Sequence, residues 1–463
     1  MGTRARFEIL DSSKTALANC NMVAGGDVKV MLDILEEHFE ELEFLWLQRD
    51  LAIAAPDYDL ADLAELDERV EAHIDGLRIA GDAGWEIAKE QLVGDEAGEV
   101  FAGAVLAFES GDEQRIGEVL EVASQSVELA RGAISALGWL TYQQAQPHIQ
   151  KLIESDEPMR RRIGIAAAAV HRQNPGPSLN KAVSDGEVLV RARALRAVGE
   201  LGRMDLLAAV KSHLQAEDES CRFWAAWSAS LLNDRSGIGI LRETAEAGGL
   251  LAERACQVAA RRMGQAEAMQ WQKQLAEREQ HHRLAIIAAG AIGEPVLMPW
   301  LIEMMKVKDM ARPAGEAFST ITGVDIAYEN LEDEGPESPE AGPTETAEES
   351  VEMELVEDAE MDSDEELEME VDPDEDLPWP EPELISKWWS NNQGRFPAGR
   401  RHLGGKPIVF ETLREVLKTG KQRQRAAAAL EMVFLQPGQP LFEVRARADR
   451  QLQAIGSNPA GRT

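Results

Sequence analysis

Apolar and small residues recur through the middle of the chain at spacings that predict a tandem array of helices. In residues 193–199 a small residue, Ala194, is followed five positions later by another, Gly199. The pair recurs in six further apolar-periodic stretches, at Ala102 and Ala107, Ala133 and Gly138, Gly164 and Ala169, Ala225 and Ser230, Ala255 and Ala260, and Ala285 and Gly290. Successive second members lie 31, 31, 30, 31, 30 and 30 residues apart. This constant period favours a repeat array over a plain antiparallel bundle.

Each marked stretch follows another apolar-periodic segment, such as residues 204–215, and turn sequences rich in Asn, Pro and Gly separate the two. The unit is therefore helix, turn, helix, and its small residues allow neighbouring helices to approach closely. We expect an all-α fold, an α-solenoid of short (30–31 residue) HEAT-like repeats over residues 95–327, with a degenerate eighth unit near residues 311–323. The period resembles that of the short HEAT-like repeats of phycobilin lyases.

Residues upstream of the repeats predict an N-terminal helical cap over 30–94, with helices near 31–54, 60–78 and 83–93, after a mobile N-terminal extension at 1–29. The first helix carries more apolar residues than one buried face needs. Phe44 and Trp46 are therefore candidates for contact with a partner. The alternative is that they pack on the second helix and the first repeat.

Downstream, residues 331–386 contain 25 Asp and Glu and no Lys or Arg, which accounts for most of the net charge of -36. Their low apolar content predicts a disordered acidic linker at 328–383. An acidic mimic of nucleic acid that blocks a toxin is an alternative. A C-terminal helical unit, tethered by this linker, is expected at 384–458, with helices near 384–396, 408–418, 423–434 and 442–455.

The composition excludes several classes of protein. No apolar run is long enough to span a bilayer, and the first thirty residues lack the apolar core of a secretion signal. The three cysteines are far apart and show no metal-binding spacing, which fits a reducing, cytoplasmic compartment. The acidic tract disfavours nucleic acid and anionic membranes as partners.

Motifs that would indicate catalysis are absent from the sequence. None of the eight histidines is followed by Glu, unlike the metal-binding His-Glu pairs of HEAT-type deoxyhypusine hydroxylases. No phosphate-binding loop, GxSxG turn or HExxH is present. We therefore expect no catalytic, metal or cofactor-binding residues, and a protein that is not an enzyme.

A group of arginines falls on or beside the second helices of successive repeats, which line the concave side of such solenoids. They are Arg160, Arg161, Arg162, Arg191, Arg193, Arg222, Arg254, Arg261, Arg262 and Arg283. They could clamp carboxylates of a partner. Alternatively, they form a ladder that bonds loop carboxylates such as Asp185 and Asp218 and joins neighbouring repeats. In a third hypothesis, the acidic linker covers this basic surface until a partner displaces it.

Residues 44–50 (FLWLQRD), 57–63 (DYDLADL) and 66–81 resemble an uncharacterised bacterial HEAT-repeat family associated with type VI secretion gene clusters. The resemblance extends through the repeats to the C-terminal segment. It implies a cytoplasmic adaptor or chaperone that binds an effector or spike protein of the secretion system. An immunity protein that neutralises a cognate toxin is the alternative, and a HEAT-like DNA-binding or DNA-repair protein is less favoured because of the acidic tract.

Overall fold

The computed structural model describes residues 31–93, 96–333, 335 and 372–456. The expected mobile extension at 1–29 and residues 336–371 of the expected disordered linker lie outside the described residues, as does Cys20. Within the described residues the protein is an all-α solenoid, as the repeat period predicted.

Three helices precede the repeats, in the range assigned to the N-terminal cap: α1 (Leu32–Ala52), α2 (Leu60–Ala80) and α3 (Asp82–Gln91). The start of α2 is fixed by Asp59, whose carboxylate accepts hydrogen bonds from the first free backbone N–H groups of the helix. Apolar side chains of α1 and α2 pack against each other and on the first repeat.

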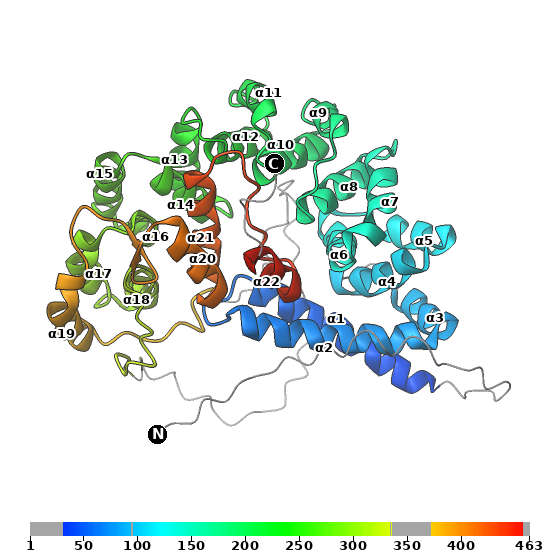
Figure 1. Cartoon of the computed structure of the whole chain (residues 1–463), viewed down its shortest axis with the longest axis horizontal. Coiled ribbons are helices and arrows are strands. Elements are labelled where there is room, and N and C mark those ends of the chain that lie inside the picture. The colour runs from blue at the N-terminus through cyan, green and yellow to red at the C-terminus, as the bar shows by residue number, and fades with distance from the viewer. Residues whose placement is uncertain (1–30, 94–95, 334, 336–371, 457–463) are drawn as a thin grey trace.

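The repeats form two layers. The inner helices are α4 (Ala97–Ser110), α6 (Val127–Trp139), α8 (Pro158–Val170), α10 (Val188–Glu200), α12 (Glu219–Leu231), α14 (Ala252–Arg262), α16 (His282–Ile292) and α18 (Lys308–Thr322). The outer helices are α5 (Glu113–Ala123), α7 (Tyr142–Ile153), α9 (Pro177–Ala182), α11 (Leu207–Ser212), α13 (Ile238–Ala247), α15 (Gln265–Ala276) and α17 (Met298–Met304). Figure 1 shows the inner helices following an arc, with α1 and α2 running across its open side.

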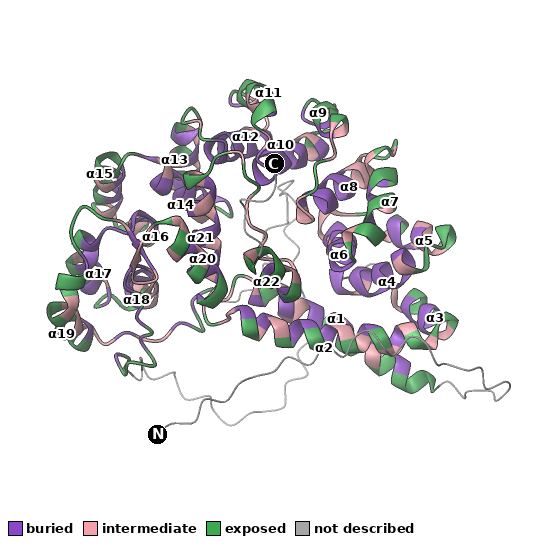
Figure 2. Cartoon of the chain, viewed as in Figure 1, coloured by how far each residue is buried: buried purple, intermediate pink, exposed green. Residues whose placement is uncertain are grey.

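Small residues that set the period lie where helices touch: Gly138, Gly199 and Gly290 meet the next inner helix, and Gly164 meets the outer helix α7. Except for Gly290, which is half-buried, all are buried. A Cβ atom added to Gly199 of α10 would lie 2.5 Å from Ser228 Oγ and 2.9 Å from Ser228 Cα on α12. Larger residues would force these helices apart, so close packing explains why the pattern repeats. Figure 2 shows the buried residues concentrated along the inner layer.

The C-terminal unit consists of α19 (Pro382–Asn392), a short hairpin of β1 (His402–Leu403) and β2 (Lys406–Pro407), then α20 (Phe410–Thr419), α21 (Gln422–Leu435) and α22 (Ala448–Gly456). It is not a separate tethered unit: α20, α21 and α22 lie inside the arc of the solenoid (Figure 1). The predicted tail helix at 442–455 begins later, at Ala448. Residues 436–447 cross the concave face without helical structure.

Both ends of the expected linker belong to the fold, which corrects its boundaries. Glu332 and Pro380 form an antiparallel bridge, and the backbone N–H of Glu381 donates to the carbonyl oxygen of Leu331 at 2.8 Å. Asp374 is buried and pairs with Arg283 of the solenoid. Burial of a few apolar residues and specific ion pairs therefore hold residues 328–333 and 372–383 in place, despite their acidic composition.

Candidate protein-binding surfaces

Three of the predicted arginines repeat one bonding pattern near the start of successive inner helices. Arg161 Nη1 donates to the carbonyl oxygens five and six residues earlier, at 2.9 and 3.2 Å, and Arg191 and Arg222 do the same in their own repeats. Arg161 also forms two 3.1 Å hydrogen bonds to the carboxylate of Asp185. These contacts are those of the ladder alternative: they hold the loops between helices and link one repeat to the next.

Three other arginines of the set are buried, which corrects the prediction that they contact a partner. Arg162, Arg193 and Arg261 expose 0%, 2% and 8% of their surface. Arg193 Nη1 bonds Glu200 Oε2 at 3.0 Å, and Arg261 pairs with Glu431 of α21. Their guanidinium groups are buried inside the protein and are not accessible to a partner.

The remaining arginines of the set also contact neighbouring side chains. Arg160 pairs with Glu157 at 2.9 Å, and Arg283 pairs with Glu253 at 2.6 Å. Arg262 bonds Asn233 Oδ1 at 2.8 Å and lies over the ring of Phe434, while Arg254 lies over the ring of Trp224. The concave arginines therefore do not form an open basic stripe.

The concave face is instead occupied by residues 441–448, which we call the strap. The strap is held through its main chain: Leu441 N–H donates to the carbonyl oxygen of Glu200 at 2.9 Å, and Arg172 Nε donates to the carbonyl oxygen of Leu441. At its other end, Ala448 N–H donates to Asp67 Oδ2 at 2.6 Å. Main-chain groups thus hold both ends of the strap.

The surface beneath the strap includes Asp50, Asp67, Glu71, Arg172 and Glu200, and we call it the groove. Side chains at every second position of the strap form ion pairs with it. Glu443 pairs with Arg172 at 3.0 Å. Arg445 pairs with Asp50 at 2.9 Å, and Arg447 pairs with Glu71 at 2.7 Å and lies over the ring of Trp139. Between these residues the backbone turns, because the N–H of Ala446 donates to the carbonyl oxygen of Glu443 at 3.4 Å.

The groove carries charges of both signs with fixed protonation. Burial alone would raise the pKa of Glu200, but Arg193, Arg196 and Arg172 outweigh it and hold this pKa at about 2. Burial likewise opposes ionisation of Asp50, yet Arg445 and Arg131 lower its pKa. With the strap in place, both carboxylates are therefore ionised at neutral pH.

Sequence reasoning missed the acidic side of this groove. Asp50, Asp67 and Glu71 come from α1 and α2, far in sequence from the arginines of the repeats. The one local signal was the run of charged residues Glu443, Arg445 and Arg447, whose side chains require oppositely charged partners.

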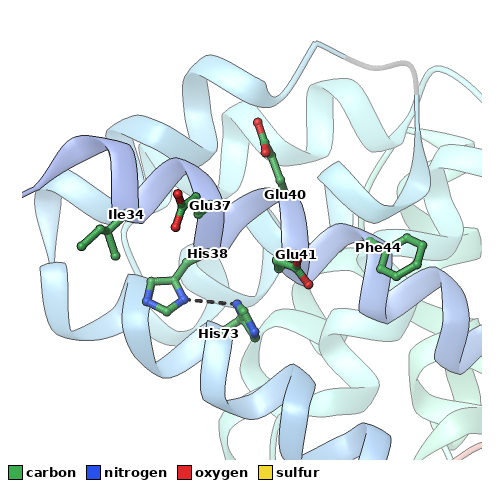
Figure 3. A pocket seen from close by; sticks show the side chains of 7 residues that line it. All are labelled: Ile34, Glu37, His38, Glu40, Glu41, Phe44 and His73. Atoms are coloured by element: carbon green, nitrogen blue, oxygen red, sulfur yellow. Dashed lines mark hydrogen bonds between the residues drawn. The ribbon is translucent and has the colours of Figure 1, made fainter.

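The outer face of α1 is a second candidate surface (Figure 3). Ile34, Glu37, His38, Glu40, Glu41 and Phe44 of α1 and His73 of α2 line a surface depression of ≈ 610 Å³. His38 Nδ1 and His73 Nδ1 are hydrogen-bonded at 3.2 Å. Phe44 is 54% exposed, as a partner-binding residue requires.

Trp46, the other aromatic candidate on α1, belongs to the core, which corrects its assignment to a partner surface. It is 3% exposed, stacks on Phe101 at 5.6 Å between ring centroids, and donates from Nε1 to Ser135 Oγ at 2.8 Å. Side chains two positions apart on a helix point in roughly opposite directions, so Phe44 and Trp46 cannot share one surface.

No group of three or more His, Cys, Asp or Glu side chains in the described residues is placed to hold a metal ion. None of the helices in this part of the chain combines the length and apolar character needed to cross a membrane. Comparison with protein-family models and with curated proteins finds no match for the sequence.

Proposed function

We propose that the protein is a non-enzymatic scaffold that binds another protein, and that it serves in the cytoplasm as an adaptor or chaperone for an effector or spike component of a type VI secretion system. The general part of this proposal is supported by the repeat architecture, since solenoids present long surfaces to partners. The specific part is supported only by the family resemblance of residues 44–81.

The observation that carries the proposal is a set of three exposed apolar residues on the outer face of α1, which we call the seam. Ile34, Phe44 and Leu51 are 41%, 54% and 39% exposed. They stand in one row with the polar residues Glu37, Glu41 and Gln48, and this row has the alternating three- and four-residue spacing by which one helix packs against another. Exposed apolar residues in such a row are typical of a docking surface.

The acidic residues around the seam indicate which charge the partner carries. Glu37, Glu40 and Glu41 are exposed around the depression in Figure 3. A partner helix with apolar residues along one face and Lys or Arg at its flanks would complement both features.

The experiment is affinity purification of the tagged protein from its native host, followed by identification of the bound proteins. We expect a secretion effector or spike component with the wild-type protein, and its loss with Phe44→Ser. The matched control is Tyr328→Ser, which alters an exposed aromatic residue (82%) far along the chain. Recovery of no secretion component, or equal recovery with Phe44→Ser, would contradict the proposal.

Co-expression with a candidate toxin distinguishes the immunity alternative. An immunity protein restores growth of cells that produce the toxin, whereas an adaptor leaves the toxin active. The DNA-binding alternative is disfavoured, because the concave arginines that would contact phosphates are engaged within the chain.

A further inference from the structure

The strap does not fill the groove in which it lies. A cavity of ≈ 90 Å³ remains between the strap and the inner helices. Ala446 is the smallest strap side chain that lines it, and Trp46, Ile134 and Trp139 form its apolar part. This space is larger than one water molecule needs. A larger apolar side chain at the position of Ala446 would therefore gain contacts that alanine cannot make.

The contacts that hold the strap are mostly of a kind that another chain could reproduce. Main-chain hydrogen bonds to Glu200, Arg172 and Asp67 do not depend on the identity of the bound residue. Of the strap residues only Ala448 is buried, and the others are half-buried. Partly exposed ion pairs contribute little to binding, each on its own. Hydrogen bonds and ion pairs thus hold the strap in place, and no large apolar side chain of the strap is buried in the groove.

We propose that the groove beneath the strap is a binding site for a segment of a partner protein that turns as residues 443–446 do, and that the strap competes with this segment as an intramolecular substitute. The segment has an acidic residue that faces Arg172, followed at two-residue steps by two basic residues that face Asp50 and Glu71. Between the two basic residues it carries Leu, Met or Phe, which enters the cavity beside Ala446.

The tether explains how the strap retains the groove in the free protein. The strap continues from α21 on one side and into α22 on the other, so its local concentration at the groove is high. Its N-terminal connection is accessible: Gln436, Pro437, Gln439 and Pro440 are exposed. A partner segment of equal affinity would be excluded, and a segment that also fills the cavity would compete better.

This inference rests on the proposed role in protein binding, but it concerns a different surface from α1. Phe44→Ser should leave peptide binding to the groove unchanged, so the two proposals fail independently. Loss of the partner in pull-downs with Phe44→Ser says nothing against the groove.

The test uses the full chain with a protease site introduced at residues 437–440, cleaved after folding. Fluorescence anisotropy then follows a labelled peptide with the sequence of residues 439–448 and a second peptide in which Ala446 is replaced by Leu. Cleavage frees one end of the strap and so lowers the local concentration at which the strap competes for the groove. We expect the cleaved protein to bind the strap peptide, the Leu peptide to bind at least fivefold more tightly, and the uncleaved protein to bind both at least tenfold more weakly.

Charge reversal provides the control for specificity. Arg172→Glu should weaken binding of the strap peptide about tenfold, and a peptide with Glu443→Arg should recover most of the loss. A scrambled peptide of the same composition should bind at least tenfold more weakly than the strap peptide. Equal binding of the scrambled peptide, or no binding of either peptide to the cleaved protein, would overturn the proposal.

Discussion

Arg261 of α14 and Glu431 of α21 form an ion pair inside the protein, with Arg261 Nε 3.3 Å from Glu431 Oε1 and only 4% of each side chain exposed. Arg401, which follows α19, pairs with the same carboxylate. Burial lowers the pKa of Arg261 to about 10, with Glu431 opposing this shift, so the guanidinium stays charged at neutral pH. One carboxylate thus joins the inner layer of the solenoid to the C-terminal unit.

Replacing Glu431 by Gln should strongly destabilise the protein. The change leaves two guanidinium groups without their carboxylate, and breaking a buried ion pair costs about 3–5 kcal/mol. Urea denaturation measures the loss. Glu411→Gln, at an exposed position of α20, should change the free energy of unfolding by less than about 0.5 kcal/mol. A similar small effect at Glu431 would show that α21 is not held in this way.

Two glycine-to-alanine substitutions should change the free energy of unfolding in opposite directions. Gly199→Ala places a Cβ atom within 2.9 Å of Ser228 Cα, so α10 and α12 must move apart, at a cost of about 1–3 kcal/mol. Gly117→Ala, within α5, meets no atom within 4 Å and should stabilise the protein by up to about 1 kcal/mol, because alanine favours helix. Thermal or urea unfolding of both variants checks the prediction. Equal effects would exclude close packing as the reason for the small residues.

Small residues at helix contacts, such as Gly199, explain why the solenoid could be predicted from the sequence. Each repeat contacts its neighbours through the same positions, so one steric requirement appears again and again at a constant spacing. The short outer helices were harder to delimit, since α9 and α11 are only six residues long. The pattern fixed the order and type of the elements more securely than their ends.

The pH dependence of stability should change when Glu43 of α1 is replaced by Gln. Burial, with Glu96 and Glu99 nearby, raises the pKa of Glu43 to about 7 in the folded protein. Its folded pKa lies above its unfolded value, so the stability present at low pH is lost as the pH rises from about 4.5 through 7.

Glu43→Gln should therefore stabilise the protein at pH 8 by about 1 kcal/mol, a figure reduced for the partial exposure of the side chain. The advantage should shrink as the pH falls toward 4.5. Unfolding curves between pH 4.5 and 8 measure it, with Glu36→Gln at an exposed position of the same helix as control. A gain that does not vary with pH would contradict this assignment.

Phe44 and Trp46 should differ sharply on truncation, although they are neighbours in sequence. Trp46→Ala removes a buried ring that packs on Phe101 and should cost about 3–5 kcal/mol. Phe44→Ala removes an exposed ring and should change stability by less than about 0.5 kcal/mol. Calorimetric melting of both variants provides the comparison. A large loss with Phe44→Ala would mean that Phe44 supports the fold rather than a partner surface.

The candidate surfaces were harder to predict than the fold, for a physical reason. An arginine such as Arg172 can pair equally well with a carboxylate of a partner or of its own chain, and the sequence does not say where Glu443 lies. Apolar excess on α1 indicated that some residue was exposed, but only the packing of Phe101 decides that Trp46 is not the one. Contacts between distant, dissimilar segments leave no periodic trace.

The strap and α21 together join the two ends of the array. In an open solenoid each repeat touches only its neighbours, so a terminal repeat can fray while the others stay folded. Here Ala448 bonds Asp67 of α2, and Arg423 of α21 bonds both the carbonyl oxygen of Ala54, which follows α1, at 2.8 Å and Glu316 of α18 at 2.9 Å. Fraying at either end must break contacts with the other. The closed arrangement should therefore melt in a single cooperative transition, whereas a chain with the strap released should melt in stages.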